Sequence, residues 1–149
     1  MDRAVTASFA LRRAHADDAG AIARLSAQLG YPTAAEAMRE RLRALAARKA
    51  HCIRVAEDDH GMLGWIAAEQ RLSLESGESI EIVGLVVDER AYRRGVGRAL
   101  VASIEDWARE CGMARVTVRS NVLREHSHPF YEGLGFTRCK TQHVYLRTL

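Results

Sequence analysis

The sequence predicts a single mixed α/β (α+β) domain over residues 1–149, in which helices flank a mostly antiparallel sheet with one parallel pair of strands. The length of 149 residues is enough for one hydrophobic core and too short for two domains. Three strand-like segments follow one another with only short turns between them, which predicts antiparallel pairing. A helical segment then leads to the next strand, and such a crossover joins parallel strands.

The first third of the chain predicts one strand and two helices. Residues 9–13 begin with the alternation of a strand. Asp17 or Asp18 can cap a helix that Gly30 ends, and Thr33-Ala34-Ala35-Glu36 has the form of a capping box that starts a second helix. The inward positions at helical spacing are Ile22, Leu25 and Leu29 in the first helix, and Met38, Leu42 and Leu45 in the second. The arginines on the other face of the second helix indicate a solvated surface rather than a site for an acidic substrate.

The remaining strand patterns complete the sheet. Residues 52–57 and 62–74 predict two strands that precede the central one. Residues 115–119 predict a parallel neighbour of the central strand. Residues 136–140 and 142–147 predict a closing hairpin.

The most informative stretch runs from Ser79 to Cys111 and predicts a strand, a basic glycine turn and a helix. The β-branched run Ile82–Val87 is typical of a strand that is buried on both faces. In the turn, Gly95 and Gly97 allow the backbone to approach a ligand, and three arginines add positive charge. The unpaired N–H groups of the first helical turn point towards the same place. Together these features predict a site for a phosphate or pyrophosphate.

Two common phosphate loops do not match this turn. A Walker loop needs Lys-Ser or Lys-Thr after the glycines, and none follows here. A dinucleotide loop needs a small residue where Leu100 stands. The turn instead resembles the acyl-CoA loop Q/R-x-x-G-x-G/A of the GCN5-related N-acetyltransferases (GNAT), with Gly95 and Gly97 as its glycines.

The resemblance of the loop has one departure. Tyr92 stands at the first position, where the family has Gln or Arg, and Arg93 and Arg94 can supply the missing charge. A second frame, Arg94-x-x-Gly97-x-Ala99, satisfies the letters but shifts the loop by two residues. We prefer the first frame because it keeps the usual distance from the strand.

A second stretch, residues 120–136, resembles the same superfamily. It contains S-N-x-x-R followed by F-Y-x-x-L-G-F. Phe130 and Leu134 lie four residues apart, on one face of a short helix. Gly135 suits the left-handed position after that helix, and Phe136 would return to the sheet. Two motifs in the expected order identify the chain as a member of the GNAT superfamily.

The resemblance implies that acetyl-CoA lies where the two parallel central strands splay apart. The backbone of Leu85, Val86 and Val87 would pair with the pantetheine arm. The pyrophosphate would lie on Arg93, Arg94, Gly95, Val96, Gly97, Arg98 and Ala99. Asn121 would bond the pantetheine or the acetyl end.

Two catalytic residues are implied in the same way. An alkyl ammonium titrates near 10.4, so acetyl transfer to it needs a base. Glu81 stands on the central strand where members of the family often carry that base, and in a regular strand it shares a face with Leu85 and Val87. A structural role, as a solvent-facing or salt-bridged residue of the strand, is an equal alternative for Glu81. Tyr131 corresponds to the family's general acid, which would protonate the departing thiolate; its alternative is a half-buried ring with a hydrogen-bonded hydroxyl.

Together, these expectations predict an acetyl-CoA-dependent N-acetyltransferase. Its acceptor would be a primary amine of a small molecule, which attacks the acetyl group directly in a ternary complex. A protein lysine or an N-terminal amine is the alternative acceptor. A catalytically silent acyl-CoA-binding regulatory module is the alternative class of protein. We expect acetyl-CoA and an amine as partners, with no nucleic acid, no membrane and no metal; a homodimer is left open.

The composition, 48% hydrophobic and 28% charged, is ordinary for a soluble globular protein. The net charge of +3 allows an anionic co-substrate, but scattered basic residues with few aromatics do not indicate nucleic-acid binding. No stretch approaches the ~20 apolar residues of a membrane span, and the first residues lack the apolar core of a secretion signal, so we expect a cytoplasmic protein. Cys52, Cys111 and Cys139 have no C-x-x-C spacing and predict reduced, mostly buried thiols. His126 and His128 lack a third ligand for a metal site.

Overall fold

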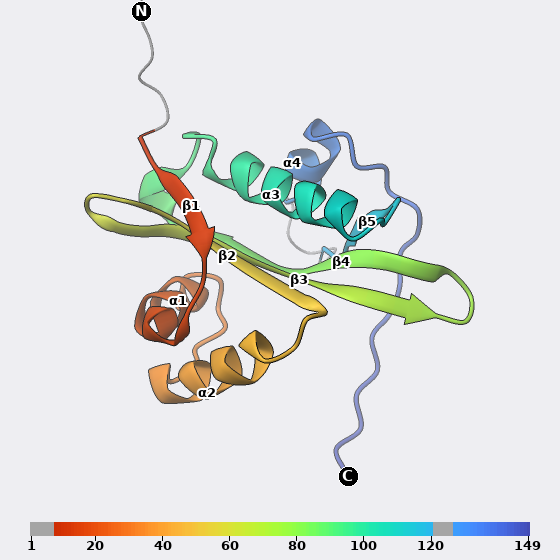
Figure 1. Cartoon of the computed structure of the whole chain (residues 1–149), viewed down its shortest axis with the longest axis horizontal. Coiled ribbons are helices and arrows are strands. Elements are labelled where there is room, and N and C mark those ends of the chain that lie inside the picture. The colour runs from red at the N-terminus through yellow and green to blue at the C-terminus, as the bar shows by residue number, and fades with distance from the viewer. Residues whose placement is uncertain (1–7, 121–126) are drawn as a thin grey trace, which may run out of the picture. The chain divides into compact units, whose positions relative to one another are not determined.

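The structure is a computed structural model that describes residues 8–120 and 127–149 (Figure 1). The chain forms two compact units, Met1–Val118 and Arg119–Leu149. Within the described residues, no helix is both long enough and apolar enough to span a bilayer.

The first unit is built on a five-stranded sheet. Its elements are β1 (Ala10–Arg13), the 3-10 turn η1 (Ala16–Asp18), α1 (Ala19–Ala27), α2 (Ala35–Ala46), β2 (His51–Asp58), β3 (Gly61–Ser73), β4 (Gly77–Val87), the 3-10 turn η2 (Glu89–Ala91), α3 (Val96–Glu110) and β5 (Val116–Val118). The strands lie in the order β1-β2-β3-β4-β5, and neighbours are antiparallel except β4 and β5, which are parallel. The predicted fold class is therefore confirmed.

Helices cover both faces of this sheet (Figure 1). α1 and α2 lie on one face, and α3 lies on the other. The core under α1 and α2 is formed by Ala19, Ile22, Leu25, Leu42, Val55, Met62 and Val86. On the opposite face, a Cβ atom at Gly64 of β3 would lie 3.3 Å from side-chain atoms of Val96 and Leu100, so α3 packs closely on the sheet there. Of the apolar positions predicted to face inward, Ile22, Leu25 and Leu42 are buried, and Leu29 and Met38 pack partly buried against this core. Leu45 is half-buried.

β4 is not a regular strand. Its pairing with β3 passes from Ile82 directly to Gly84, so Val83 is the extra residue of a β-bulge. Val83 is 52% exposed, which differs from the prediction that the run Ile82–Val87 is buried on both faces. A bulge inserts one residue and so reverses the alternation of side chains beyond it.

The bulge changes the neighbours of Glu81. Because directly opposite residues of paired strands share a face, Glu81 lies on the same face as Gly84 and Val86, which is the face that α1 and α2 cover. Leu85 and Val87 lie on the other face. The expectation that Glu81 shares a face with these two residues, which assumed a regular strand, is therefore wrong.

The start of α2 also differs from the prediction. The helix begins at Ala35 with Ala34 at the N-cap, and no side chain caps it. The hydroxyl of Thr33 contacts the carbonyl oxygen of Tyr31 at 3.5 Å instead. The helix predicted by the capping-box pattern is present, but the capping box is not.

Asp18 precedes α1 without capping it through its side chain. Its carboxylate accepts the His15 N–H at 2.8 Å and two hydrogen bonds from Arg12, at 2.8 and 2.9 Å. Arg12 also donates to Glu57 at 2.9 Å, so one guanidinium joins β1, η1 and β2. Burial alone would raise the pKa of Asp18, but the hydrogen bonds from Arg12 and His15 outweigh it and hold this pKa below its usual value.

We expect Asp18→Asn to lower the free energy of unfolding by about 1–3 kcal/mol at neutral pH, because charge-assisted hydrogen bonds to a buried carboxylate are lost. A carboxyl group whose pKa is lowered by folding stabilises the protein above its unfolded pKa, near 3.9, and this contribution disappears as the pH falls through the folded pKa. The difference between the two proteins should therefore narrow below about pH 4 in urea titrations. Asp17→Asn, at an exposed neighbour, is the matched control, and an equal effect of both substitutions would contradict the prediction.

The second unit contains α4 (Ser127–Gly133). Gly135 follows it with φ +97, and the N–H groups of Gly135 and Phe136 donate to the carbonyls of Glu132 and Tyr131, both at 3.1 Å. This pair of bonds is a Schellman motif, which needs a residue that tolerates a positive φ. The predicted helix end at Gly135 is confirmed.

The predicted closing hairpin is absent. Residues 136–140 and 142–147 form no strand in the structure. Val144, Tyr145 and Leu146 are about nine-tenths exposed. An alternating sequence forms a strand only where another strand supplies hydrogen-bond partners, and within the described residues none is paired with this segment.

The cysteines are free, as predicted, but they are not all buried. Cys52 lies in the sheet, and burial raises the pKa of its thiol. Cys111 is partly buried and its Sγ accepts a hydrogen bond from Gln70 Nε2 at 3.2 Å. Cys139 is exposed, so one of the three thiols is buried and the expectation of mostly buried thiols is wrong.

Candidate active site

The parallel pairing of β4 with β5 is short and leaves one edge of β4 open. β5 pairs only with Ile80–Ile82, whereas β4 continues to Val87. In the part of the chain that the structure describes, no strand pairs with this edge at residues 83–87. Backbone N–H and C=O groups on such an edge can bind an extended ligand as an additional strand. The residues predicted to bind pantetheine, 85–87, lie on this edge.

A hydrogen-bonded turn fixes the end of β4. The Asp88 N–H donates to the carbonyl of Leu63 at 2.7 Å, and the buried Asp88 carboxylate accepts the Arg90 N–H at 3.1 Å. The Arg90 guanidinium pairs with Asp88 at 3.0 Å and donates to the carbonyl of Met62 at 3.3 Å. The turn is therefore anchored to the start of β3, so the segment that follows it leaves the sheet in a fixed direction.

α3 begins directly after this turn. Gly95 is its N-cap and has φ +83, a conformation that side chains with a Cβ rarely adopt. The first helical bond joins the Ala99 N–H to the Gly95 carbonyl at 3.0 Å. The N–H groups of Val96, Gly97 and Arg98 therefore have no acceptor within the helix, and they point outward from its N-terminus. This geometry, with the positive end of the helix dipole, suits an anion.

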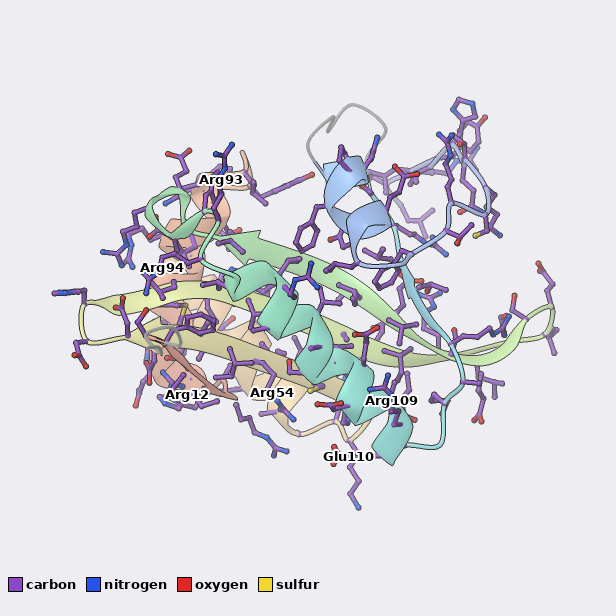
Figure 2. All side chains as sticks on the ribbon, turned by 90° about the horizontal axis from the view of Figure 1, so that it is seen from above. Arg12, Arg54, Arg93, Arg94, Arg109 and Glu110 are labelled. Atoms are coloured by element: carbon purple, nitrogen blue, oxygen red, sulfur yellow. The ribbon has the colours of Figure 1, made fainter. Side chains whose placement is uncertain are left out.

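Two arginines stand in the loop ahead of this helix (Figure 2). Arg93 has φ +69, the only positive φ of a non-glycine residue within the described chain. Arg94 donates to the Ser8 hydroxyl at 2.7 Å and lies 3.4 Å from a carboxylate oxygen of Asp58. Both of these arginines, which were predicted to bind the pyrophosphate, thus lie in the loop that leads into α3, and Arg94 is paired with Asp58.

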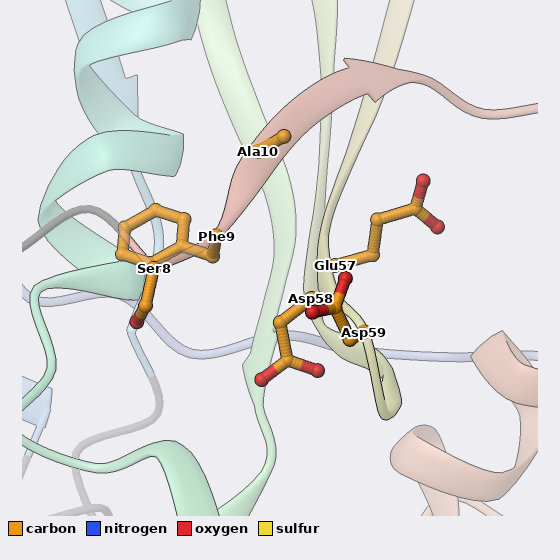
Figure 3. A pocket seen from close by; sticks show the side chains of 6 residues that line it. All are labelled: Ser8, Phe9, Ala10, Glu57, Asp58 and Asp59. Carbon is orange, nitrogen blue, oxygen red and sulfur yellow. The ribbon is translucent and has the colours of Figure 1, made fainter.

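An acidic pocket of about 440 Å³ adjoins Arg94 (Figure 3). It lies between the segment that enters β1 and the end of β2, and its lining is Ser8, Phe9, Ala10, Glu57, Asp58 and Asp59. The His60 N–H, followed by Arg94, holds the pKa of Asp58 below its usual value, so this carboxylate is charged at neutral pH. A phosphate would be repelled by three carboxylates, and the pocket is therefore not the predicted pyrophosphate site.

Glu81 lies in a charged group on the part of β4 that is paired with both β3 and β5. It is 7% exposed and stands directly opposite Glu69 of β3. Nη1 of Arg71 lies 3.0 Å from Oε1 of Glu69 and 3.7 Å from Oε2 of Glu81. His51 of β2 is 3.8 Å from the other oxygen of Glu69. A base and a salt-bridged residue, two of the interpretations of Glu81 made from the sequence, are compatible with these contacts. The third, a solvent-facing residue, is wrong because Glu81 is buried.

Glu69 and Arg71 were not predicted from the sequence. They are two residues apart in β3 and so lie on one face of the sheet, which was visible in the sequence. That this face is also the face of Glu81 depends on the register between β3 and β4, which the sequence does not display. The anchoring pair Asp88 and Arg90 was not predicted either. Both residues donate to backbone carbonyls of β3, and a sequence does not show which carbonyls lie near a given side chain.

The other two predicted residues belong to the second part of the chain. Asn121 lies outside the described residues. The Tyr131 ring makes edge-to-face contacts with Phe130 and Phe136, with centroids 5.1 and 5.7 Å apart. The phenol ring is thus held by an aromatic cluster within its own unit.

Comparison with protein families gives a direct match. The model of the acetyltransferase (GNAT) family matches residues 19–136. An uncharacterized N-acetyltransferase of Bacillus subtilis, YhdJ, is 28% identical over 99 residues, which are 66% of this chain and 70% of that protein.

Solved structures have the same fold. Aminoglycoside N-acetyltransferase AAC(6')-Iy in complex with CoA superposes with a TM-score of 0.84 at 17% identity, covering 95% of each chain. Glucosamine-6-phosphate N-acetyltransferase from Arabidopsis thaliana superposes with a TM-score of 0.82 at 20% identity, covering 94% of this chain and 99% of that one. Because the family model spans most of the sequence and both motifs fall within it, this protein belongs to the GNAT family of acetyltransferases.

Proposed function

We propose that this protein transfers the acetyl group of acetyl-CoA to the primary amine of a small molecule, by direct attack in a ternary complex. The observation that supports the proposal is that two binding features follow one another along this GNAT chain. The open edge of β4 leads through an anchored turn into an α3 N-terminus whose amides have no acceptor within the helix. Such an arrangement suits a ligand with an extended arm and a phosphate group at its end.

The proposed placement of acetyl-CoA follows this path. The pantetheine arm pairs with the backbone of residues 85–87, and the pyrophosphate lies on residues 93–99. The left-handed Gly95 and the two arginines support this assignment. In this placement Arg94 exchanges its contact with Asp58 for one with the phosphate. Asn121 is proposed to bond the pantetheine or the acetyl end.

The proposed chemistry needs two proton transfers. Presenting an amine that titrates near 10.4 in its neutral form at pH 7 costs about 4–5 kcal/mol, which a base can offset. Glu81 takes the proton of the attacking nitrogen, directly or through a water. The nitrogen forms a bond with the acetyl carbon as the C–S bond breaks. Tyr131 donates its proton to the departing thiolate and regains one from solvent.

The choice of a small amine as acceptor is supported by the neighbours of the same fold, which include an aminoglycoside and a glucosamine-6-phosphate acetyltransferase. A panel of acceptors tests this choice. It contains an aminoglycoside, glucosamine 6-phosphate, a lysine peptide and a peptide with a free N-terminus, and CoA release is measured for each. We expect release with a small amine above the rate without acceptor. Release only with a peptide would favour a protein acceptor, and CoA binding without release for any amine would favour a silent acyl-CoA-binding module.

Gly97→Asp tests the proposed pyrophosphate site. The carboxylate adds bulk and a like charge among the outward amides of α3, so affinity for CoA should fall by roughly tenfold or more, because like charges at one site repel. The measurement is CoA binding by calorimetry, with circular dichroism to show that the variant is folded. Ala102→Asp places the same charge on an exposed position of the same helix and should retain the parent affinity. Unchanged affinity in folded Gly97→Asp would refute the placement.

A further inference from the structure

The charged group around Glu81 joins three strands on one face of the sheet. His51, Glu69 and Glu81 occupy opposed positions in β2, β3 and β4. Arg71 lies two residues beyond Glu69 on the same strand and therefore on the same face. Its Nη1 atom is within 4 Å of both carboxylates, at 3.0 Å from Glu69 and 3.7 Å from Glu81. One cation is thus shared by two acidic residues on adjacent strands.

The two carboxylates are in different environments. The Glu81 side chain is 10% exposed, whereas the Glu69 side chain is 26% exposed and Arg71 47%. A nearly buried carboxylate beside a second carboxylate is unfavourable unless a cation compensates it. Arg71 supplies that cation from a half-exposed position, and its hydrogen bond to Glu69 fixes where the guanidinium stands.

We propose that Arg71, held by Glu69, is a positioning residue for Glu81 in acetyl transfer. The guanidinium orients the Glu81 carboxylate through their ion pair, while its own hydrogen bond is donated to Glu69. The guanidinium lies 3.7 Å from Glu81 and compensates its negative charge, and its shorter contact with Glu69, at 3.0 Å, anchors it. Glu81 can then accept the proton of an attacking amine. This inference rests on the proposed role of Glu81 as the base.

A double-mutant cycle between Arg71 and Glu81 tests the proposal. Arg71→Met keeps an unbranched apolar stem and removes the guanidinium with its charge. We expect it to lower kcat roughly tenfold or more, a part of the ~10²–10⁴-fold that a general base contributes, and to leave the KM for acetyl-CoA unchanged. In the Glu81→Gln background the same substitution should have no further effect, since Arg71 acts only through Glu81. Arg71→Lys, which keeps the charge, should recover part of kcat.

The controls separate this proposal from the proposed function. Arg109→Met removes the arginine of another ion pair, with Asp106 at 3.0 Å on the surface of α3, and should keep the parent kcat (Figure 2). Parent kcat in Arg71→Met, or a loss that recurs in full in the Glu81→Gln background, would overturn the role of Arg71 while leaving Glu81 as the base. Parent kcat in Glu81→Gln itself would overturn both.

Discussion

Replacing Glu81 by Gln should lower kcat by about 10²- to 10⁴-fold at neutral pH. The amide keeps the shape of the side chain in its nearly buried position but accepts no proton from the attacking amine. The deficit should shrink as the pH rises towards 10.4, because a growing fraction of the acceptor is then already neutral. The measurement is the pH dependence of kcat and of kcat/KM for the parent protein and the variant, with the best acceptor of the panel.

The control for this variant is Glu110→Gln, at an exposed position near the end of α3 (Figure 2). It removes a carboxylate of the same kind and should retain the parent pH profile. A deficit in Glu81→Gln that is equal at every pH would assign Glu81 to the charge balance with Arg71 and Glu69 rather than to proton transfer. Absence of any deficit would do the same.

The surroundings of Glu81 were predictable from the sequence only in part. The position of the residue in the central strand follows from the β-branched run and its flanking turns. Its face does not, because the bulge inserts Val83, a residue that fits a regular strand as well as its neighbours do. The bulge is an irregularity in the pairing of β3 with β4, and the register of that pairing depends on both strands.

Element order and several helix ends were predictable because they depend on local physics. Apolar residues at helical spacing define α1, α2 and α3, and glycine supplies the left-handed residue after α4. The prediction of a capping box at Thr33 was wrong, although a capping box also depends only on neighbouring residues. The helix starts one residue later than that pattern requires, with Ala34 at the N-cap. The closing hairpin failed because alternation describes a strand but does not supply its partner.

The candidate site divides in the same way. The glycine turn and the arginines before α3 were found from the sequence, since their geometry is set by adjacent residues. The ion pairs of Arg94 with Asp58 and of Arg71 with Glu81 were not found. Arg94 and Asp58 lie 36 residues apart in the sequence, and Arg71 meets Glu81 only through the register of β3 with β4. Charge alone gives no indication of which acidic residue an arginine will meet.

Tyr131→Phe should lower kcat within the same ~10²–10⁴-fold range while leaving affinity for acetyl-CoA nearly unchanged. A thiol titrates near 8.5 and a phenol near 10, so a tyrosine remains protonated at neutral pH and can donate a proton as the C–S bond breaks. The substitution removes only the hydroxyl. The ring that packs between Phe130 and Phe136 is retained, so the Schellman end of α4 should persist.

Stability is the second measurement on this variant, because the hydroxyl could contribute to folding as well as to catalysis. Loss of one hydrogen bond should cost no more than about 1–1.5 kcal/mol of unfolding free energy, which leaves the variant folded in the assay. Tyr145→Phe makes the same change at an exposed tyrosine and should alter neither kcat nor stability. Parent kcat in Tyr131→Phe would remove Tyr131 from the mechanism. An unfolded variant would instead identify its hydroxyl as a structural donor, and the proton for the thiolate would then have to come from another group or from water.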